Sequence, residues 1–145
     1  MLVEDNPADV DLIEEALAEG HIDCELVVIQ DGDKAIAAIE LSDADTERAC
    51  PDLMLLDLNL PKVTGEEVLK RVRSSRTFRD IKVLIVSSSN APSDRERVMQ
   101  LGATDYFRKP STLDQFMELG PRVRSLLRMS EVINEGHFGD EIAPR

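Results

Sequence analysis

Short apolar runs alternate with amphipathic stretches along most of this chain. Apolar runs of this kind indicate strands buried in a sheet, and we expect five of them, at residues 1–4, 25–29, 53–57, 82–86 and 104–108. Between them, apolar residues recur at helical spacing, which predicts helices over residues 7–19, 32–40, 64–73, 93–101 and 112–128. This alternation predicts an α/β fold with a doubly wound, five-stranded, all-parallel sheet and right-handed crossovers.

Three stretches depart from this pattern. Residues 42–48 are polar and have no periodicity, so we expect a surface loop there. Gly120-Pro121 falls inside the last predicted helix, where proline removes a backbone hydrogen bond, so we expect a bend or a second short helix. Residues 129–145 contain further glycine and proline and indicate a tail that is loose or docked elsewhere. We therefore expect one domain over residues 1–128 and a C-terminal tail over 129–145.

The formal net charge of −12 narrows the range of partners. Nucleic acids select for basic surfaces, so we expect no nucleic-acid partner, whereas basic proteins and divalent cations remain possible partners. No apolar run approaches the roughly 20 residues that cross a bilayer, and the amino end is acidic, so we expect no membrane association and a cytoplasmic location. Cys24 and Cys50 lack metal-ligand spacing, so we expect reduced thiols.

Residues able to carry out chemistry follow four of the predicted strands. In a parallel sheet these strand ends lie along one edge, where open α/β folds place their ligand crevices. Taken singly, each residue has an ordinary structural explanation as a helix cap, a turn former or a solvated strand end. Taken together they predict one site, made of the residues Glu4, Asp5, Asp57, Ser87 and Lys109.

The residue types at this edge are those of a metal-assisted phosphoryl transfer site. Mg²⁺ prefers a few carboxylates and waters, which here indicates Asp5 and Asp57, with Glu4 direct or through water and the Asn59 backbone carbonyl as a further oxygen. Asp57 would be the nucleophile, while Lys109 and Ser87 would contact the transferred phosphate. Positioning and electrostatics would then carry the step.

With this set of residues, the chain resembles the receiver domain of two-component response regulators. The resemblance runs from Leu2 to about Arg128 and rests on Glu4-Asp5, the block from Leu55 to Pro61 with Gly65, Ser87, and Lys109-Pro110. It implies the flavodoxin-like receiver fold, Mg²⁺ as cofactor, and a sensor histidine kinase that transfers a phosphoryl group to Asp57. It also implies that Ser87 and Lys109 move onto the phosphate and that Tyr106 couples the site to the face of the fourth helix, fifth strand and fifth helix.

Three segments further resemble the stand-alone regulators that are paired with bacterial and cyanobacterial phytochromes. They are the opening Val3-Glu-Asp-Asn-Pro-Ala-Asp9 and the block Asp57-Leu-Asn-Leu-Pro61, together with the loop before Pro51-Asp52. This resemblance implies a light-sensing kinase, such as a bacteriophytochrome, as partner. It also implies a homodimer through the face of the fourth helix, fifth strand and fifth helix.

The expected function is therefore signalling through changed protein contacts and not enzymatic turnover, since 145 residues leave no room for an output domain. The main alternative is a receiver-like scaffold that binds partners without being phosphorylated. An Asp-dependent phosphohydrolase is disfavoured because Asp57-Leu58-Asn59 lacks a second acid. A dinucleotide-binding domain is disfavoured because no glycine-rich loop follows the first strand.

Overall fold

The computed structural model describes the backbone of residues 1–138 and the side chains of residues 1–129. Strands and helices alternate along the chain, as expected from the apolar pattern. In chain order they are β1 Leu2–Val3, α1 Pro7–Glu19, β2 Val28–Ile29, α2 Gly32–Ala44, β3 Leu53–Leu56, α3 Gly65–Ser74, β4 Lys82–Ser87, α4 Pro92–Gln100, β5 Asp105–Arg108, α5 Leu113–Phe116 and α6 Leu119–Phe138.

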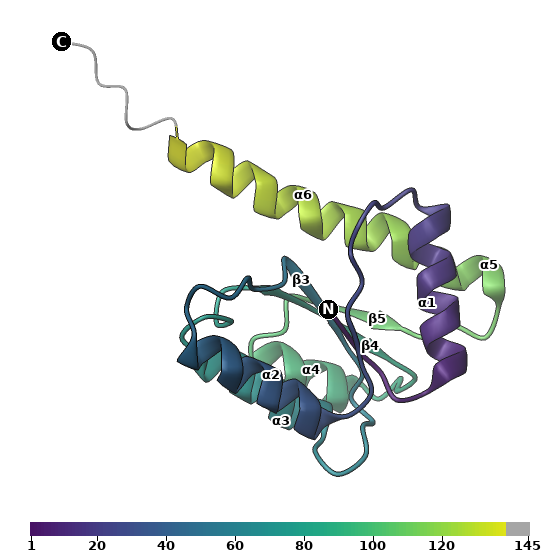
Figure 1. Cartoon of the computed structure of the whole chain (residues 1–145). Helices are drawn as coiled ribbons and strands as arrows, with labels where there is room; N and C mark the ends of the chain where they lie inside the picture. Colours follow the sequence, from purple (N-terminus) through teal and green to yellow (C-terminus); the bar gives the residue numbers. More distant parts are fainter. Residues whose placement is uncertain (139–145) are drawn as a thin grey trace.

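The strands form one parallel sheet in the order β2-β1-β3-β4-β5. Helices α2, α3 and α4 cover one face, and α1, α5 and the first part of α6 cover the other (Figure 1). Each face buries its own apolar cluster, one around Ile39, Met54 and Val68 and one around Ile13, Leu84 and Leu119. The predicted doubly wound fold is confirmed.

Several element boundaries differ from the sequence-based expectation. The second strand was expected over 25–29, but only Val28–Ile29 pairs with β1. Helix α2 continues to Ala44, so the first part of the predicted loop at 42–48 is helical. The predicted strand beginning at Thr104 begins instead at Asp105. In each case the hydrogen-bonding partner, and not the apolar pattern, sets the end of the element.

The last predicted helix is divided, as the Gly120-Pro121 pair suggested, but at a different point. Helix α5 ends at Phe116 and α6 begins at Leu119, so Pro121 lies in the first turn of α6, where a missing N–H costs no helical hydrogen bond. Helix α6 continues through Arg128 to Phe138, so the first part of the expected tail is helical. Residues 139–145 of that tail lie outside the described residues. In the described part, no helix is both long and apolar enough to span a bilayer.

Asp43 joins the end of α2 to the turn that follows α3. Its Oδ1 accepts hydrogen bonds from the Ser75 hydroxyl at 2.7 Å and from the Thr77 hydroxyl and N–H at 2.8 and 3.0 Å. Its Oδ2 accepts from Arg71 Nη2 at 2.9 Å. The Ser75 bond contributes most to holding the pKa of Asp43 well below its usual range, and Thr77 and Arg71 contribute in the same direction.

We expect Asp43→Asn to lower the melting temperature, because the amide cannot supply the charge that these donors stabilise. A carboxylate whose pKa is depressed by folding stabilises the fold above its unfolded pKa of about 4, and this contribution is lost as the pH falls below that value. The difference between wild type and variant should therefore be largest near neutral pH and shrink toward about pH 3. Thermal unfolding across this pH range measures it.

Asp45→Asn is the matched control, since the exposed Asp45 carboxylate accepts only the local Glu47 N–H at 3.2 Å and lies 3.7 Å from Arg48 among the described residues. Its melting temperature should follow that of wild type at every pH. An Asp43→Asn curve that also follows wild type would show that the network around Asp43 does not stabilise the fold.

Candidate functional site

Three carboxylates meet where β1 and β3 end. Glu4 and Asp5 directly follow β1, Asp57 directly follows β3, and these two strands are hydrogen-bonded neighbours. One carboxylate oxygen from each residue lies within 4.8 Å of one from each of the others. Glu4 is 1% exposed and Asp57 5% exposed, whereas Asp5 is open to solvent. The result is a small acidic site that is buried on one side and accessible on the other.

Lys109, which directly follows β5, supplies the balancing positive charge. Its Nζ lies 2.8 Å from Glu4 Oε2, 2.8 Å from Asp9 Oδ2 and 3.6 Å from Asp57 Oδ2. Its backbone N–H donates to the Ser87 carbonyl at 2.8 Å, which anchors it beside the end of β4. A single ammonium therefore contacts three carboxylates from three segments of the chain.

Burial and charge shift the titration of this cluster. Burial raises the pKa of Glu4 to about 7, and the negative charge of Asp57 adds to the rise, although the hydrogen bond from Lys109 opposes it. Burial alone would lower the pKa of Lys109, but hydrogen bonds to Asp9 and Glu4 and the charge of Asp57 outweigh it and raise that pKa. Lys109 is thus a fixed cation. The carboxylates around it carry more negative charge than this single ammonium can neutralise.

The loop after β3 is held close to the start of α3. The Gly65 N–H donates to the Leu58 carbonyl at 3.0 Å, and a Cβ placed on Gly65 would lie 2.2 Å from the Asp57 carbonyl oxygen. No side chain fits at position 65 unless the backbone moves. The helix begins there because Thr64 and Glu67 form a capping box. This packing fixes the backbone that carries Asp57.

Residues at the ends of β4 and β5 form the neighbouring part of the site. Ser87 is buried, and its hydroxyl accepts the Ser89 N–H at 3.2 Å. Tyr106 is also buried, and its hydroxyl donates to the Ser89 carbonyl at 2.9 Å. The guanidinium of Arg95 in α4 lies 5.8 Å from the centre of the Tyr106 ring. Tyr106 thus connects the loop after β4 with the outer surface of α4.

Most of the residues singled out in the sequence lie together in the structure. Glu4, Asp5, Asp57 and Lys109 are mutually close, and Ser87 ends the adjacent strand. Asn59 donates its N–H to Asp57 Oδ1 at 3.3 Å, while its carbonyl as a metal ligand remains a prediction.

Asp9 was missed, because the candidate residues were taken from the strand ends and Asp9 lies inside a helix. Its position in the first turn of α1, shortly after the acids that end β1, was the available signal. In the structure Asp9 contacts Lys109 at the sheet edge.

The donor set suits a hard divalent cation. Glu4, Asp5 and Asp57 offer only oxygen atoms, and their number leaves coordination positions for water or a phosphate oxygen. A soft metal would favour thiolate ligands, but Cys24 and Cys50 line a hollow near the opposite ends of the strands. The residues present therefore fit a Mg²⁺-type ion at this sheet edge.

Comparisons with known proteins agree with this geometry. The chain is 32% identical to the response regulator Rcp1 of Synechocystis over 125 residues, covering 86% of this chain and 85% of Rcp1. It is 37% identical to the transcriptional regulatory protein TrcR of Mycobacterium tuberculosis over 90% of this chain, but it spans only 45% of TrcR.

Solved structures show the same likeness. The phosphorylated cyanobacterial phytochrome response regulator RcpA matches with a TM-score of 0.76 and 36% identity, covering 87% of this chain and 90% of RcpA. The Mn²⁺-bound form of Rcp1 matches with a TM-score of 0.68 and 30% identity, covering 99% and 96%. The model of the response regulator receiver domain matches residues 1–119. The chain therefore belongs to the response regulator receiver domain family.

Proposed function

We propose that this protein is a response regulator whose receiver domain accepts a phosphoryl group on Asp57 from a sensor histidine kinase. The observation that carries the proposal is the placement of Asp57, which lies close to two further carboxylates and 3.6 Å from the ammonium of Lys109. A buried carboxylate beside both additional acids and a fixed cation suits an acceptor of an anionic group. An ion pair that only stabilised the fold would need Lys109 and one carboxylate, and not the additional acids beside Asp57.

The transfer forms a bond between an Asp57 carboxylate oxygen and phosphorus while the bond from phosphorus to the kinase imidazole nitrogen breaks. The electron pair of that bond stays on the imidazole, and Asp57 becomes an acyl phosphate. Asn59 N–H holds Asp57 Oδ1, so Oδ2, which faces Lys109, is the better placed nucleophile. The protein is a phosphoacceptor that takes part in its own phosphorylation and dephosphorylation, and not a turnover enzyme.

Mg²⁺ held by Asp5 and Asp57, with Glu4 and the Asn59 carbonyl assisting, would offset the negative charge of carboxylate and phosphate. Support comes from the three clustered carboxylates in this chain and from the Mn²⁺-bound form of the similar protein Rcp1. The residues of the chain supply orientation: β1 and β3 fix the carboxylates, and Gly65 lets α3 pack against the Asp57 backbone.

Lys109 and Ser87 would respond to the new phosphate. In the structure, Lys109 Nζ lies 2.8 Å from a carboxylate oxygen of Glu4 and of Asp9, and 3.6 Å from one of Asp57. A phosphate on Asp57 places additional negative charge on that side, which draws the ammonium from Asp9. Ser87 would turn its hydroxyl from the Ser89 N–H toward the phosphate, which frees the loop after β4.

That loop is coupled to the surface by Tyr106, whose hydroxyl binds the Ser89 carbonyl. A shift of the loop would change the position of Tyr106 and of Arg95 on α4. The signal would thus leave the site as a change of protein contacts on the face formed by α4, β5 and the predicted fifth helix, which the structure divides into α5 and α6. We propose this face as a homodimer surface. The likeness to RcpA and Rcp1 supports a phytochrome-type histidine kinase as the partner.

Removing one acid should stabilise the metal-free protein and weaken its response to metal. We expect Asp5→Asn to raise the metal-free melting temperature by about 2–4 °C, since like charges a few ångströms apart repel by about 1 kcal/mol. Saturating Mg²⁺ should stabilise wild type by about 2–3 kcal/mol and the variant far less. Thermal unfolding with and without Mg²⁺ measures both effects, and Asp11→Asn on the exposed side of α1 is the control.

Asp57→Asn should abolish phosphotransfer, because an amide oxygen at this position is not a nucleophile for the phosphoryl group. Incubation with a phosphorylated histidine kinase carrying labelled phosphate measures the transfer, and we expect a loss of at least about 100-fold. The control is Asp52→Asn, an exposed acid at the opposite end of β3 from Asp57. Label retained in folded Asp57→Asn would place the acceptor elsewhere.

Lys109→Ala should still accept phosphate but fail to transmit it. Sedimentation with and without a small-molecule phosphodonor should show a change of assembly for wild type and none for the variant. Lys70→Ala, an exposed lysine of α3, is the control and should behave as wild type. If wild type itself neither accepts phosphate nor changes assembly, the alternative of a phosphorylation-independent scaffold replaces this proposal.

A further inference from the structure

Helix α4 is held to the rest of the domain mainly by polar contacts. Of its nine described residues Val98 alone is buried, whereas α3 buries four of its ten. Its first turn also lacks a side-chain cap, because Ala91 occupies the cap position. Apolar packing and capping therefore contribute little to the position of α4, which covers the same face of the sheet as α3 (Figure 1).

The carboxyl end of α4 is anchored by Arg73 of α3. Its Nε donates to the carbonyl of Gly102, just after α4, at 2.9 Å. Its Nη1 donates to the carbonyls of Arg79 and Ile81 at 2.8 Å each. One guanidinium thus holds three main-chain acceptors, which fixes this end of α4 to α3 and to the segment before β4.

The amino end of α4 is anchored by a chain of charged and polar side chains. Arg97 Nε donates to Glu66 Oε1 in the first turn of α3, and Arg97 Nη2 donates to Asp94 Oδ1 at 3.0 Å. Asp94 Oδ2 accepts the hydroxyl of Ser89 in the loop after β4. We call Glu66, Arg97, Asp94 and Ser89 the α3–α4 network. It joins the loop after β4 to the start of the helix that follows Asp57.

Ser89 is the residue where this network meets Ser87 and Tyr106. Its N–H donates to the Ser87 hydroxyl at 3.2 Å, and its carbonyl accepts the Tyr106 hydroxyl at 2.9 Å. Its own hydroxyl donates to Asp94 and accepts the Ala91 N–H at 3.3 Å. Every polar group of Ser89 is therefore hydrogen-bonded in this arrangement, and the Ser87 hydroxyl is engaged by Ser89.

We propose that the α3–α4 network positions Ser87 by holding the loop after β4 in the arrangement that precedes phosphorylation. This inference rests on the proposed function, in which Ser87 turns from the Ser89 N–H toward a phosphate on Asp57. Ser89 moves in that turn, and its bond to Asp94 ties the movement to the ion pairs of Arg97. Arg97 and Asp94 are thus positioning residues that oppose the change and act through Ser89.

The exposure of the network sets the size of its effect. The side chains of Arg97, Asp94 and Glu66 are 53%, 31% and 24% exposed, so water and salt weaken their pairing. Pairs of this kind shift an equilibrium a few-fold, and not by orders of magnitude. The network therefore tunes how readily the loop rearranges, and its effect fades at high ionic strength.

Arg97→Gln tests the proposal, because it removes both ion pairs and keeps a polar side chain of similar helix propensity. In the unphosphorylated protein, amide hydrogen exchange at Ser89 and Ala91 should become about three- to fivefold faster by NMR. With saturating Mg²⁺, the affinity for beryllofluoride, a phosphoryl mimic, should rise about three- to fivefold by titration calorimetry. An arginine that only stabilised the fold would lower the melting temperature without raising this affinity.

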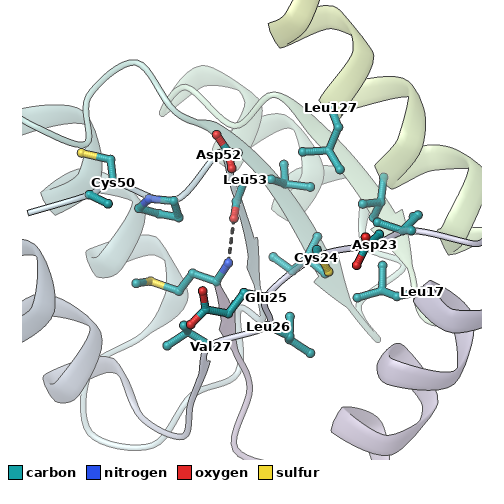
Figure 2. Close-up of a pocket in the computed structure, with 16 residues that line it drawn as sticks. Leu17, Asp23, Cys24, Glu25, Leu26, Val27, Cys50, Asp52, Leu53 and Leu127 are labelled. Atoms are coloured by element: carbon teal, nitrogen blue, oxygen red, sulfur yellow. Dashed lines mark hydrogen bonds between the residues drawn. The ribbon is translucent and has the colours of Figure 1, made fainter.

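Two exposed residues provide matched controls. Arg79→Gln removes the same charge from a side chain that forms no hydrogen bond or ion pair among the described residues. Asp94→Asn should act as Arg97→Gln does, and its control is Asp52→Asn, in the wall of the hollow in Figure 2 near the opposite ends of the strands. Both controls should behave as wild type. At about 1 M salt, the ratio of the affinities of Arg97→Gln and wild type should approach one.

Unchanged exchange at Ser89 and Ala91 in Arg97→Gln, or an affinity no higher than that of wild type, would overturn the proposal. The two readouts also separate it from the proposed function. If wild type does not bind the mimic, the phosphoacceptor role of Asp57 fails, and exchange alone decides whether the network holds the loop. If wild type binds the mimic and Arg97→Gln matches it in both readouts, only the inference about the network fails.

Discussion

The structure depends on the balance between Lys109 and the carboxylates that surround it. Glu4, Asp9 and Asp57 share one ammonium, and Asp5 adds a further negative charge within 4.8 Å. Burying like charges costs free energy unless each finds a partner, and one cation cannot satisfy all of them. The free energy of this edge is therefore lowered by any added cation. Under the proposed function, an anionic group on Asp57 would add to this negative charge and would need such a cation beside it, which would couple metal binding to phosphorylation.

The excess negative charge around Lys109 stays concentrated because the segments that hold the carboxylates are rigid. Glu4 and Asp57 extend directly from the paired strands β1 and β3, and Asp57 is further held by the close approach of Gly65. Charges on mobile loops would move apart, whereas charges on a sheet edge stay together. By contrast, Ser87 at the end of β4, Ser89 in the loop after it and Tyr106 in β5 are joined to one another by single hydrogen bonds. Under the proposed function, these bonds would rearrange while the acidic residues stay in place, which is the arrangement that a switch requires.

The sequence predicted the fold and most of the site because both follow from strand periodicity. Apolar runs that end in Asp57, Ser87 or Lys109 can be identified in the sequence, and a parallel sheet brings their ends to one edge. Asp9 could not be found in this way, because its contact with Lys109 depends on how α1 packs against the sheet. The start of β2 and the break before α6 differ from their predicted positions for a similar reason. Hydrogen bonding decides where an element stops, and apolar pattern alone does not report it.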